Sequence, residues 1–181
     1  IKVWDSGTLE LKASKENAHS RRVNSVDFSP DGTKIASVDF SPDGTGMIKV
    51  WDSDTLELKA SKENVHSSYI TSVYFSPAGS KIISGSWDKT IKVWDSGTLE
   101  LKASKENAHS RRVNSVDFSP DGTKIASVDF SPDGTGMIKV WDSDTLELKA
   151  SKENVHSSYI TSVYFSPAGS KIISGSWDKT I

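Results

Sequence analysis

A turn between two short strands is expected in Gly85-Ser86-Trp87-Asp88-Lys89-Thr90-Ile91-Lys92-Val93-Trp94-Asp95. Ser86 ends the first strand, and the next four residues make the turn. The following Ile-Lys-Val-Trp alternates between apolar and polar side chains, as a half-buried strand does. The segment Ile-Lys-Val-Trp-Asp recurs at residues 1–5, 48–52 and 138–142. The rest of the chain is arranged around this recurrence.

The chain consists of repeats. Residues 1–90 and 91–180 are identical, and Ile181 begins a further copy. Each identical unit divides into related parts of 47 and 43 residues, so that the repeats are 1–47, 48–90, 91–137 and 138–180. A period of about 40–45 residues with Trp-Asp pairs is typical of the blades of a β-propeller. We therefore predict one β-propeller unit over residues 1–181, produced by tandem duplication.

Composition excludes several classes of protein. The 22 Lys and Arg against 24 Asp and Glu give a net charge of -2, which offers no electrostatic reason to expect nucleic acid or an anionic membrane as partner. No apolar run approaches the roughly 18 residues of a membrane span. Without cysteine there is neither a disulfide nor thiolate chemistry. Because the sequence starts at Ile1 rather than Met, we expect N-terminal residues to be missing, and we expect a cytoplasmic protein.

Each part of the repeat predicts four short strands and no helix. In residues 1–47 we expect strands at 1–4, 8–14, 23–28 and from 34 onward, and in residues 48–90 at 70–75 and 81–86. Pro and Gly in Ser29-Pro30-Asp31-Gly32 and Ser76-Pro77-Ala78-Gly79 favour tight turns. The alternating Lys and Glu of residues 8–14 are typical of an outer sheet edge, where charge prevents pairing with other chains.

Over its whole length the chain resembles the WD40-repeat β-propellers. The residues that support the resemblance are His66, the runs 70–77 and 82–88, and the Ile-Lys-Val-Trp-Asp of residues 91–95. In that family a His, a Ser, an Asp and a Trp form a buried hydrogen-bonded group in each blade. The resemblance implies such groups at His66, Ser84, Asp88 and Trp94; at His19, Ser37 and Trp51; at His109, Ser127 and Trp141; and at His156, Ser174, Asp178 and Trp4.

The 47-residue repeats depart from the family pattern. They lack Gly-Ser-Trp-Asp-Lys-Thr and instead contain residues 38–47, which copy residues 25–33 with a shift. We predict that residues 38–40 extend the preceding strand and that residues 41–46 form a larger turn. The Asp of this group is then either Asp43 or Asp39, and we expect a weaker hydrogen-bonded group in these repeats. The usual Gly before the His is also replaced, by Ala18 or Val65.

The repetition argues against an enzyme. All four His stand at equivalent repeat positions, whereas a catalytic or metal site needs unlike groups at one place. We therefore predict no catalytic residue, cofactor or metal. Trp, Tyr and Arg are enriched at binding hot spots, and the candidates for contact with a protein or peptide partner are Arg21, Arg22, Tyr69, Trp87, Arg111, Arg112, Tyr159 and Trp177. Trp87 has two interpretations: partner contact, or packing on the neighbouring blade.

The chain begins with the third strand of a blade and ends after the second strand of another. This offset predicts four blades per chain, with the N-terminal strands completing a last blade, which is why Trp4 joins the group of His156. Because WD40-like blades usually close in rings of seven or eight, we predict an eight-bladed ring made by two chains, a homodimer whose chains complete each other. A window on a longer chain is the alternative. For function, we predict a binding scaffold. The first alternative is an engineered or recently amplified fragment without its own ligand, and the second is an enzyme with a site at the channel mouth.

Overall fold

A computed structural model describes residues 1–39, 46–130 and 135–181 of the chain. These residues form sixteen β-strands and no helix, which confirms the all-β class. The strands are β1 (Lys2–Trp4), β2 (Leu11–Ser14), β3 (Val23–Phe28), β4 (Lys34–Asp39), β5 (Ile48–Asp52), β6 (Leu58–Lys62), β7 (Ile70–Phe75), β8 (Lys81–Ser86), β9 (Ile91–Asp95), β10 (Leu101–Lys105), β11 (Val113–Phe118), β12 (Lys124–Asp129), β13 (Ile138–Asp142), β14 (Leu148–Lys152), β15 (Ile160–Phe165) and β16 (Ile172–Ser176).

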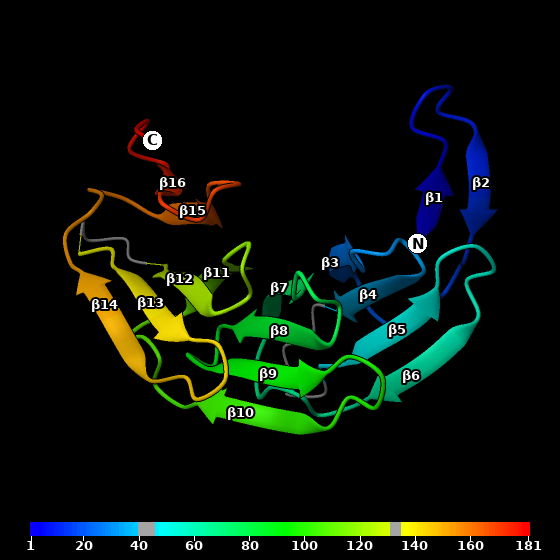
Figure 1. The fold of residues 1–181 in the computed structure, drawn as a ribbon, viewed down its shortest axis with the longest axis horizontal. Coiled ribbons are helices and arrows are strands. Elements are labelled where there is room, and N and C mark those ends of the chain that lie inside the picture. Colours follow the sequence, from blue (N-terminus) through cyan, green and yellow to red (C-terminus); the bar gives the residue numbers. More distant parts are fainter. Residues whose placement is uncertain (40–45, 131–134) are drawn as a thin grey trace.

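The strands make three four-stranded antiparallel sheets and two two-stranded ones. We call β3–β6 the first blade, β7–β10 the second and β11–β14 the third. The pair β1–β2 is the N-terminal half-blade and β15–β16 the C-terminal half-blade. The blades follow one another in an open arc, with β3, β7, β11 and β15 on its inner side and the two half-blades at its ends (Figure 1).

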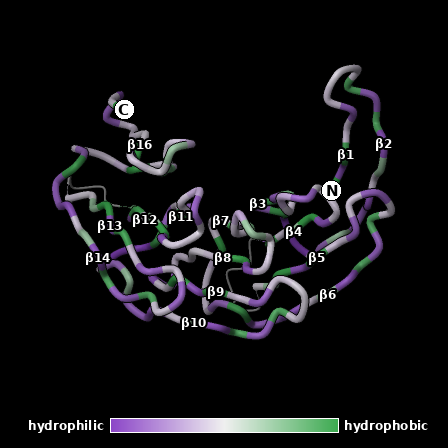
Figure 2. Tube along the Cα trace, viewed as in Figure 1, coloured by the Kyte–Doolittle hydropathy of each residue, from purple (hydrophilic) through white to green (hydrophobic). Residues whose placement is uncertain are grey.

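The burial of each strand matches its place in the blade. The second strands β4, β8 and β12 are buried at nearly every position because they lie between neighbours within a sheet and between blades. The fourth strands β6, β10 and β14 are largely exposed and carry Lys and Ser, and Figure 2 shows hydrophilic residues along them. Apolar area removed from water between successive blades is therefore the main stabilising term of the arc.

Side chains of one inner strand satisfy the free backbone edge of the next. The Asp27 carboxylate accepts the Phe75 backbone N–H at 2.8 Å, and the Ser25 hydroxyl accepts that of Val73 at 3.2 Å. Asp117 does the same for Phe165 at 2.8 Å. These contacts bind the first blade to the second and the third blade to the C-terminal half-blade. They also protect strand edges that would otherwise pair with other chains.

The outermost strand starts later than the sequence predicts. Residues 8–14 were expected to be extended, but β2 begins at Leu11 because Leu9 adopts a left-handed backbone conformation with φ of 56°. The Asp5 carboxylate accepts the backbone N–H groups of Gly7 and Thr8 at 2.9 Å each and so fixes a turn there. Alternation alone cannot reveal this turn, which depends on an Asp side chain that mimics the backbone.

The predicted extension of β4 is found as far as Asp39. Phe40 and most of the larger turn expected at residues 41–46 lie outside the described residues, as does Asp43. Gly46 is described, and its carbonyl accepts the Val65 backbone N–H at 3.0 Å.

Candidate functional site

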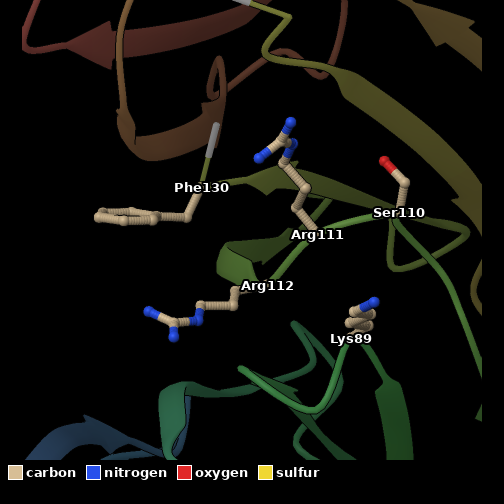
Figure 3. A pocket seen from close by; sticks show the side chains of 5 residues that line it. All are labelled: Lys89, Ser110, Arg111, Arg112 and Phe130. Atoms are coloured by element: carbon tan, nitrogen blue, oxygen red, sulfur yellow. The ribbon is translucent and has the colours of Figure 1, made fainter. Parts of the chain in front are cut away.

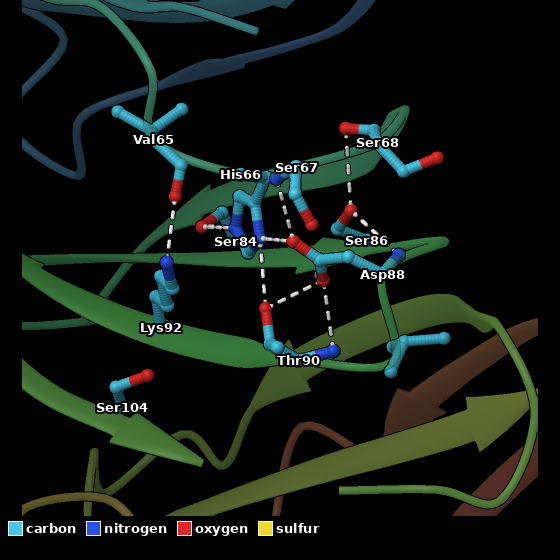
Figure 4. A network of polar contacts seen from close by, with 12 residues as sticks. Val65, His66, Ser67, Ser68, Ser84, Ser86, Asp88, Thr90, Lys92 and Ser104 are labelled. Carbon is cyan, nitrogen blue, oxygen red and sulfur yellow. Dashed lines mark hydrogen bonds and ion pairs between the residues drawn. The ribbon is translucent and has the colours of Figure 1, made fainter. Parts of the chain in front are cut away.

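The second blade contains a closed network of polar side chains (Figure 4). Trp94 Nε1 donates to Ser84 Oγ at 2.9 Å, and Ser84 Oγ lies 2.7 Å from His66 Nε2. On the other edge of the imidazole, His66 Nδ1 lies 2.9 Å from Asp88 Oδ2. The structure thus brings together the four side chains that the family resemblance implies for this blade.

The contacts assign one protonation state to His66. Since the Asp88 carboxylate can only accept, Nδ1 carries the proton that faces it, and in a neutral ring Nε2 then accepts from the Ser84 hydroxyl. Burial lowers the pKa of His66 in spite of the nearby Asp88 carboxylate, in agreement with a neutral ring. Every member of the network is satisfied, so the network can fix the geometry of the turn.

Thr90 is a fifth member that the sequence analysis missed. Its hydroxyl lies 2.8 Å from His66 Nδ1 and donates to Asp88 Oδ1 at 2.6 Å. Its backbone N–H also donates to the same carboxylate oxygen at 2.9 Å. The available signal was the Asp-Lys-Thr spacing, because an Asp side chain commonly accepts the backbone N–H two residues further on.

The first and third blades have a looser version of the network. His19 Nε2 lies 2.7 Å from Ser37 Oγ, which accepts the Trp51 indole N–H at 2.8 Å. The carboxylate nearest to His19 among the described residues is that of Asp39, at 3.6 Å from Nδ1, too far for a good hydrogen bond. Asp39 instead accepts the Met47 backbone N–H at 3.0 Å.

The third blade repeats this arrangement with His109, Ser127 and Trp141, and the Asp129 carboxylate lies 3.7 Å from His109 Nδ1. Asp39 and Asp129 extend from the end of a strand, whereas Asp88 extends from a tight turn. This difference in backbone origin explains the longer distance. Burial lowers the pKa of His19 to about 4 and also lowers the pKa of His109.

The C-terminal half-blade has the network without its Trp. His156 lies 2.8 Å from Ser174 Oγ through Nε2 and 3.0 Å from Asp178 Oδ2 through Nδ1. Trp4, which was expected to serve this group, belongs to the half-blade at the opposite end of the arc (Figure 1). One chain therefore leaves this network incomplete, and the role of Trp4 in it remains a prediction about a second chain.

Four of the eight candidate partner residues, Tyr69, Trp87, Tyr159 and Trp177, lie in a row of aromatic rings on the loops. Tyr69 and Trp87 meet edge to face at 4.6 Å between ring centroids, Trp87 faces Phe130 at 6.3 Å, and Phe130 stacks on Tyr159 at 4.0 Å. Tyr159 continues to Trp177 at 4.8 Å. Trp87 also supports the guanidinium of Arg112, whose central carbon lies 4.0 Å from the ring centroid. Of the two interpretations of Trp87, these contacts favour packing between blades.

A basic pocket lies beside this row, between the second and third blades (Figure 3). Its volume is about 540 Å³, and it is lined by Lys89, Ser110, Arg111, Arg112 and Phe130. Arg111 and Arg112 were expected to contact a partner, whereas Lys89, Ser110 and Phe130 were not identified from the sequence. Phe130 could have been identified as an aromatic residue at the end of the copied segment.

The two ends of the arc expose side chains that are buried inside it. Trp4 is 50 % exposed against 2 % for Trp94, and Leu9 is 73 % exposed against 1 % for Leu99. Ile173 is 53 % exposed against 0 % for Ile83. These pairs have identical local sequences, so only the strands packed around them differ. The same holds for Val26 and Phe28 at the N-terminal end, whose counterparts in the third blade are buried.

The N-terminal end contains an apolar groove of about 180 Å³. Its lining includes Ile1 and Val3 from the half-blade and Val26, Phe28 and Ile35 from the first blade. Inside the chain the equivalent residues of the second and third blades form one core cluster together with Ile83. The groove therefore has the lining that surrounds this isoleucine in the interior.

The described part of the chain lacks two further kinds of feature. It contains no group of three or more His, Cys, Asp or Glu placed to hold a metal ion. Nor does any helix in that part have the length and apolarity needed to cross a membrane.

Comparison with known proteins identifies the class. The family model "WD domain, G-beta repeat" matches residues 11–52, 60–95, 102–142 and 150–181, and the chain therefore belongs to the WD40 family. Among solved structures it is similar to the computationally designed Ika8 protein, with 31 % identity and a TM-score of 0.75 over 99 % of this chain and 50 % of that one. It is also similar to the computationally designed Ika4 protein, with 31 % identity and a TM-score of 0.71 over 90 % of this chain and 89 % of that one. The chain thus spans half the length of Ika8. No curated protein sequence matches it significantly.

Proposed function

We propose that the chain is a non-enzymatic WD40 scaffold that binds proteins or peptides. We further propose that two copies join head to tail and complete one eight-bladed ring by exchanging strands. The partners are thus a protein or peptide ligand and a second copy of the chain. The observation that supports the ring is the exposure, at both ends of the arc, of apolar side chains whose identical copies are buried inside it.

The internal blades supply a template for each joint. In the second blade β8 and β9 pair with Ile82 opposite Trp94 and Ile83 opposite Val93. Applied to β16 of one copy and β1 of another, this register places Ile172 opposite Trp4. The indole N–H of Trp4 then reaches Ser174 and completes the network of His156. Ile173 enters the apolar groove at the N-terminal end of the other copy.

The polar side chains support a scaffold rather than an enzyme. In the second blade, His66, Ser84 and Asp88 bind one another and Trp94, which leaves no group of this network directed at a substrate. Similar networks, looser in the first and third blades, recur along the described chain, and such recurrence is typical of a structural group rather than of a single catalytic site. The exposed features are loops with aromatic and basic side chains, which are typical of binding surfaces.

An engineered or recently amplified repeat without a ligand of its own is the second candidate. The designed proteins with which the chain shares its fold favour it, as do the identical repeats. A peptide-library screen separates the candidates, because only a binding scaffold is expected to select a consensus peptide.

Light scattering after size exclusion tests the ring. We expect a single species of twice the chain mass of 19.7 kDa. A monomer at micromolar concentration would show that the ends do not complete each other, and a ladder of larger species would show that the contact propagates without closing.

A further inference from the structure

Trp94 and Leu99 fill space between the first and second blades. Trp94 is 2 % exposed and Leu99 is 1 % exposed. Both belong to the same core cluster as Phe75 and Ile82 of their own blade and Val50 of the first blade. The outer half of the second blade, formed by β9 and β10, is therefore anchored by one Trp and one Leu.

The C-terminal end of the arc has the same surroundings without this Trp and Leu. Phe165, Ile172 and Val140 are the counterparts of Phe75, Ile82 and Val50, and all three are only partly buried. Together with Ala150 of β14 they line a mainly apolar pocket of about 350 Å³. This volume lies within the range of pockets that bind ligands.

One edge of β16 is open to a further strand. In the second blade β8 lies between β7 and β9, whereas β16 pairs only with β15 among the described strands. Trp94 of β9 is paired with Ile82 of β8, and its indole N–H donates to Ser84 at 2.9 Å. A segment that adds to β16 in the same register places its Trp opposite Ile172, beside the pocket and within reach of Ser174. Addition of an extended peptide to a free sheet edge is a common mode of recognition, in which the backbone provides affinity and the side-chain pockets provide specificity.

We propose that the edge of β16 and this pocket form a binding site for a peptide of the sequence Val-Trp-Asp-Ser-x-Thr-Leu, as found at residues 93–99. The peptide adds to β16 as a strand and places its Trp and Leu in the pocket. This inference names a ligand for the proposed peptide-binding scaffold and rests on that function. In the two-chain ring, residues 3–9 of the second copy occupy the site. In an unpaired chain the site takes the same sequence from a separate peptide, because the half-blade with Trp4 lies at the opposite end of the arc (Figure 1).

A turn gives the ligand its shape. Asp95 Oδ1 accepts the backbone N–H groups of Gly97 and Thr98 at 3.0 Å each. The Leu99 N–H donates to the Asp95 carbonyl at 2.9 Å, and Leu99 adopts a left-handed backbone conformation with φ of 57°. This turn returns the chain so that Leu99 joins the cluster of Trp94. A ligand therefore needs the Asp and the Leu at this spacing, whereas a Trp in an unrelated extended strand fills only part of the pocket.

Fluorescence anisotropy with a labelled synthetic peptide of residues 92–105 tests the proposal. The protein is the full chain with Trp4→Asp, in which one copy cannot fill the pocket of another. We expect one peptide bound per chain. Trp94→Ala in the peptide should weaken binding about thirtyfold, as loss of a buried anchor does. Leu99→Ala should weaken it about tenfold, whereas Leu101→Ala is the matched control, because Leu101 is 49 % exposed in the chain and its loss should change the affinity less than about threefold.

A second pair of variants locates the site on the protein. Ala150→Glu introduces a carboxylate into the pocket from the exposed outer strand and should abolish binding. Ser151→Glu is its control, because Ser151 is the next residue of the same strand and does not line the pocket. Peptide binding that persists with Ala150→Glu, or that is equal for the Trp94→Ala peptide, would overturn the pocket as the binding site.

Light scattering of the parent chain separates this proposal from the proposed function. A parent of twice the chain mass whose Trp4→Asp variant binds no peptide would overturn the site and leave the ring intact. A monomeric parent whose peptide binding responds to Ala150→Glu would overturn the ring and support the site. If the peptide-library screen selects a consensus without Trp, the scaffold is supported and this ligand is overturned.

Discussion

Replacement of Ile173 by alanine should weaken the proposed two-chain ring without unfolding the chain. Ile173 is 53 % exposed in one chain, and its copy Ile83 is fully buried. Complete burial of an isoleucine side chain contributes about 1.5–3 kcal/mol, so burial of the remaining half contributes about 1 kcal/mol at each joint. A two-chain ring has two joints, so the substitution should cost about 2 kcal/mol of association free energy. Alanine keeps part of the buried side chain, which lowers this cost, but the cavity that it leaves at each joint raises the cost by a similar amount.

A loss of about 2 kcal/mol raises the dissociation constant of the dimer about thirtyfold. Sedimentation velocity over a dilution series measures this shift directly. Ile83→Ala is the matched control, since the same change in the same local sequence now lies inside the chain. It should lower the free energy of unfolding by about 2–5 kcal/mol and have a much smaller effect on the dissociation constant. If Ile173→Ala dimerises as tightly as the parent, the groove does not receive this side chain and the template reasoning is wrong.

Three further results are expected. Ser84→Ala should lower the free energy of unfolding by about 1–3 kcal/mol, measured by denaturant titration, because it leaves the Trp94 indole N–H without its buried acceptor; no change would show that water replaces the hydroxyl. Asp88→Asn should destabilise more than Asp39→Asn in the same assay, because only Asp88 lies at hydrogen-bond distance from its histidine; equal losses would contradict the weaker network. The free energy of unfolding should fall as the pH is lowered from 6.5 towards 4, by about 2 kcal/mol for His19 at pH 5, because the lowered pKa of about 4 makes the unfolded chain bind the proton more readily; a stability unchanged from pH 7 to 5 would show that this ring takes up a proton as readily in the folded state as in the unfolded chain.

Most of the strand pattern could be predicted from the sequence because it depends on local rules. The strands β3, β7 and β8 have the predicted bounds, since alternation and Pro-Gly turns determine both their faces and their ends. The predicted start of β2 was wrong by three residues, because the Asp5 carboxylate stabilises a turn where apolar and polar residues still alternate in the sequence. The alternation of apolar and polar residues contains no information about such a contact between a side chain and the backbone.

The site was less predictable for a similar reason. Thr90 joins the network through a hydroxyl oxygen 2.8 Å from His66 Nδ1, and the basic pocket combines residues from two successive blades. Pairings across blades depend on the angle between sheets, which no local pattern contains. The residues that matched a family motif could be assigned in advance, whereas the place of Lys89 in the pocket could be found only from the structure.

Exact repetition makes the interior of this chain a template for its ends. Where two copies join, the completed terminal blade, which is equivalent to the second blade, precedes a first blade, which is equivalent to the third. This combination already exists between the second and third blades of one chain. The contacts at a joint can therefore be the same whatever the number of copies, so sequence does not set the size of the ring. The curvature of the arc must set it instead. The chain matches half of Ika8 over 99 % of its own length, and it also matches 89 % of Ika4 over 90 % of its own length. In the proposed ring, two copies would bury the apolar side chains that the two ends of the arc expose.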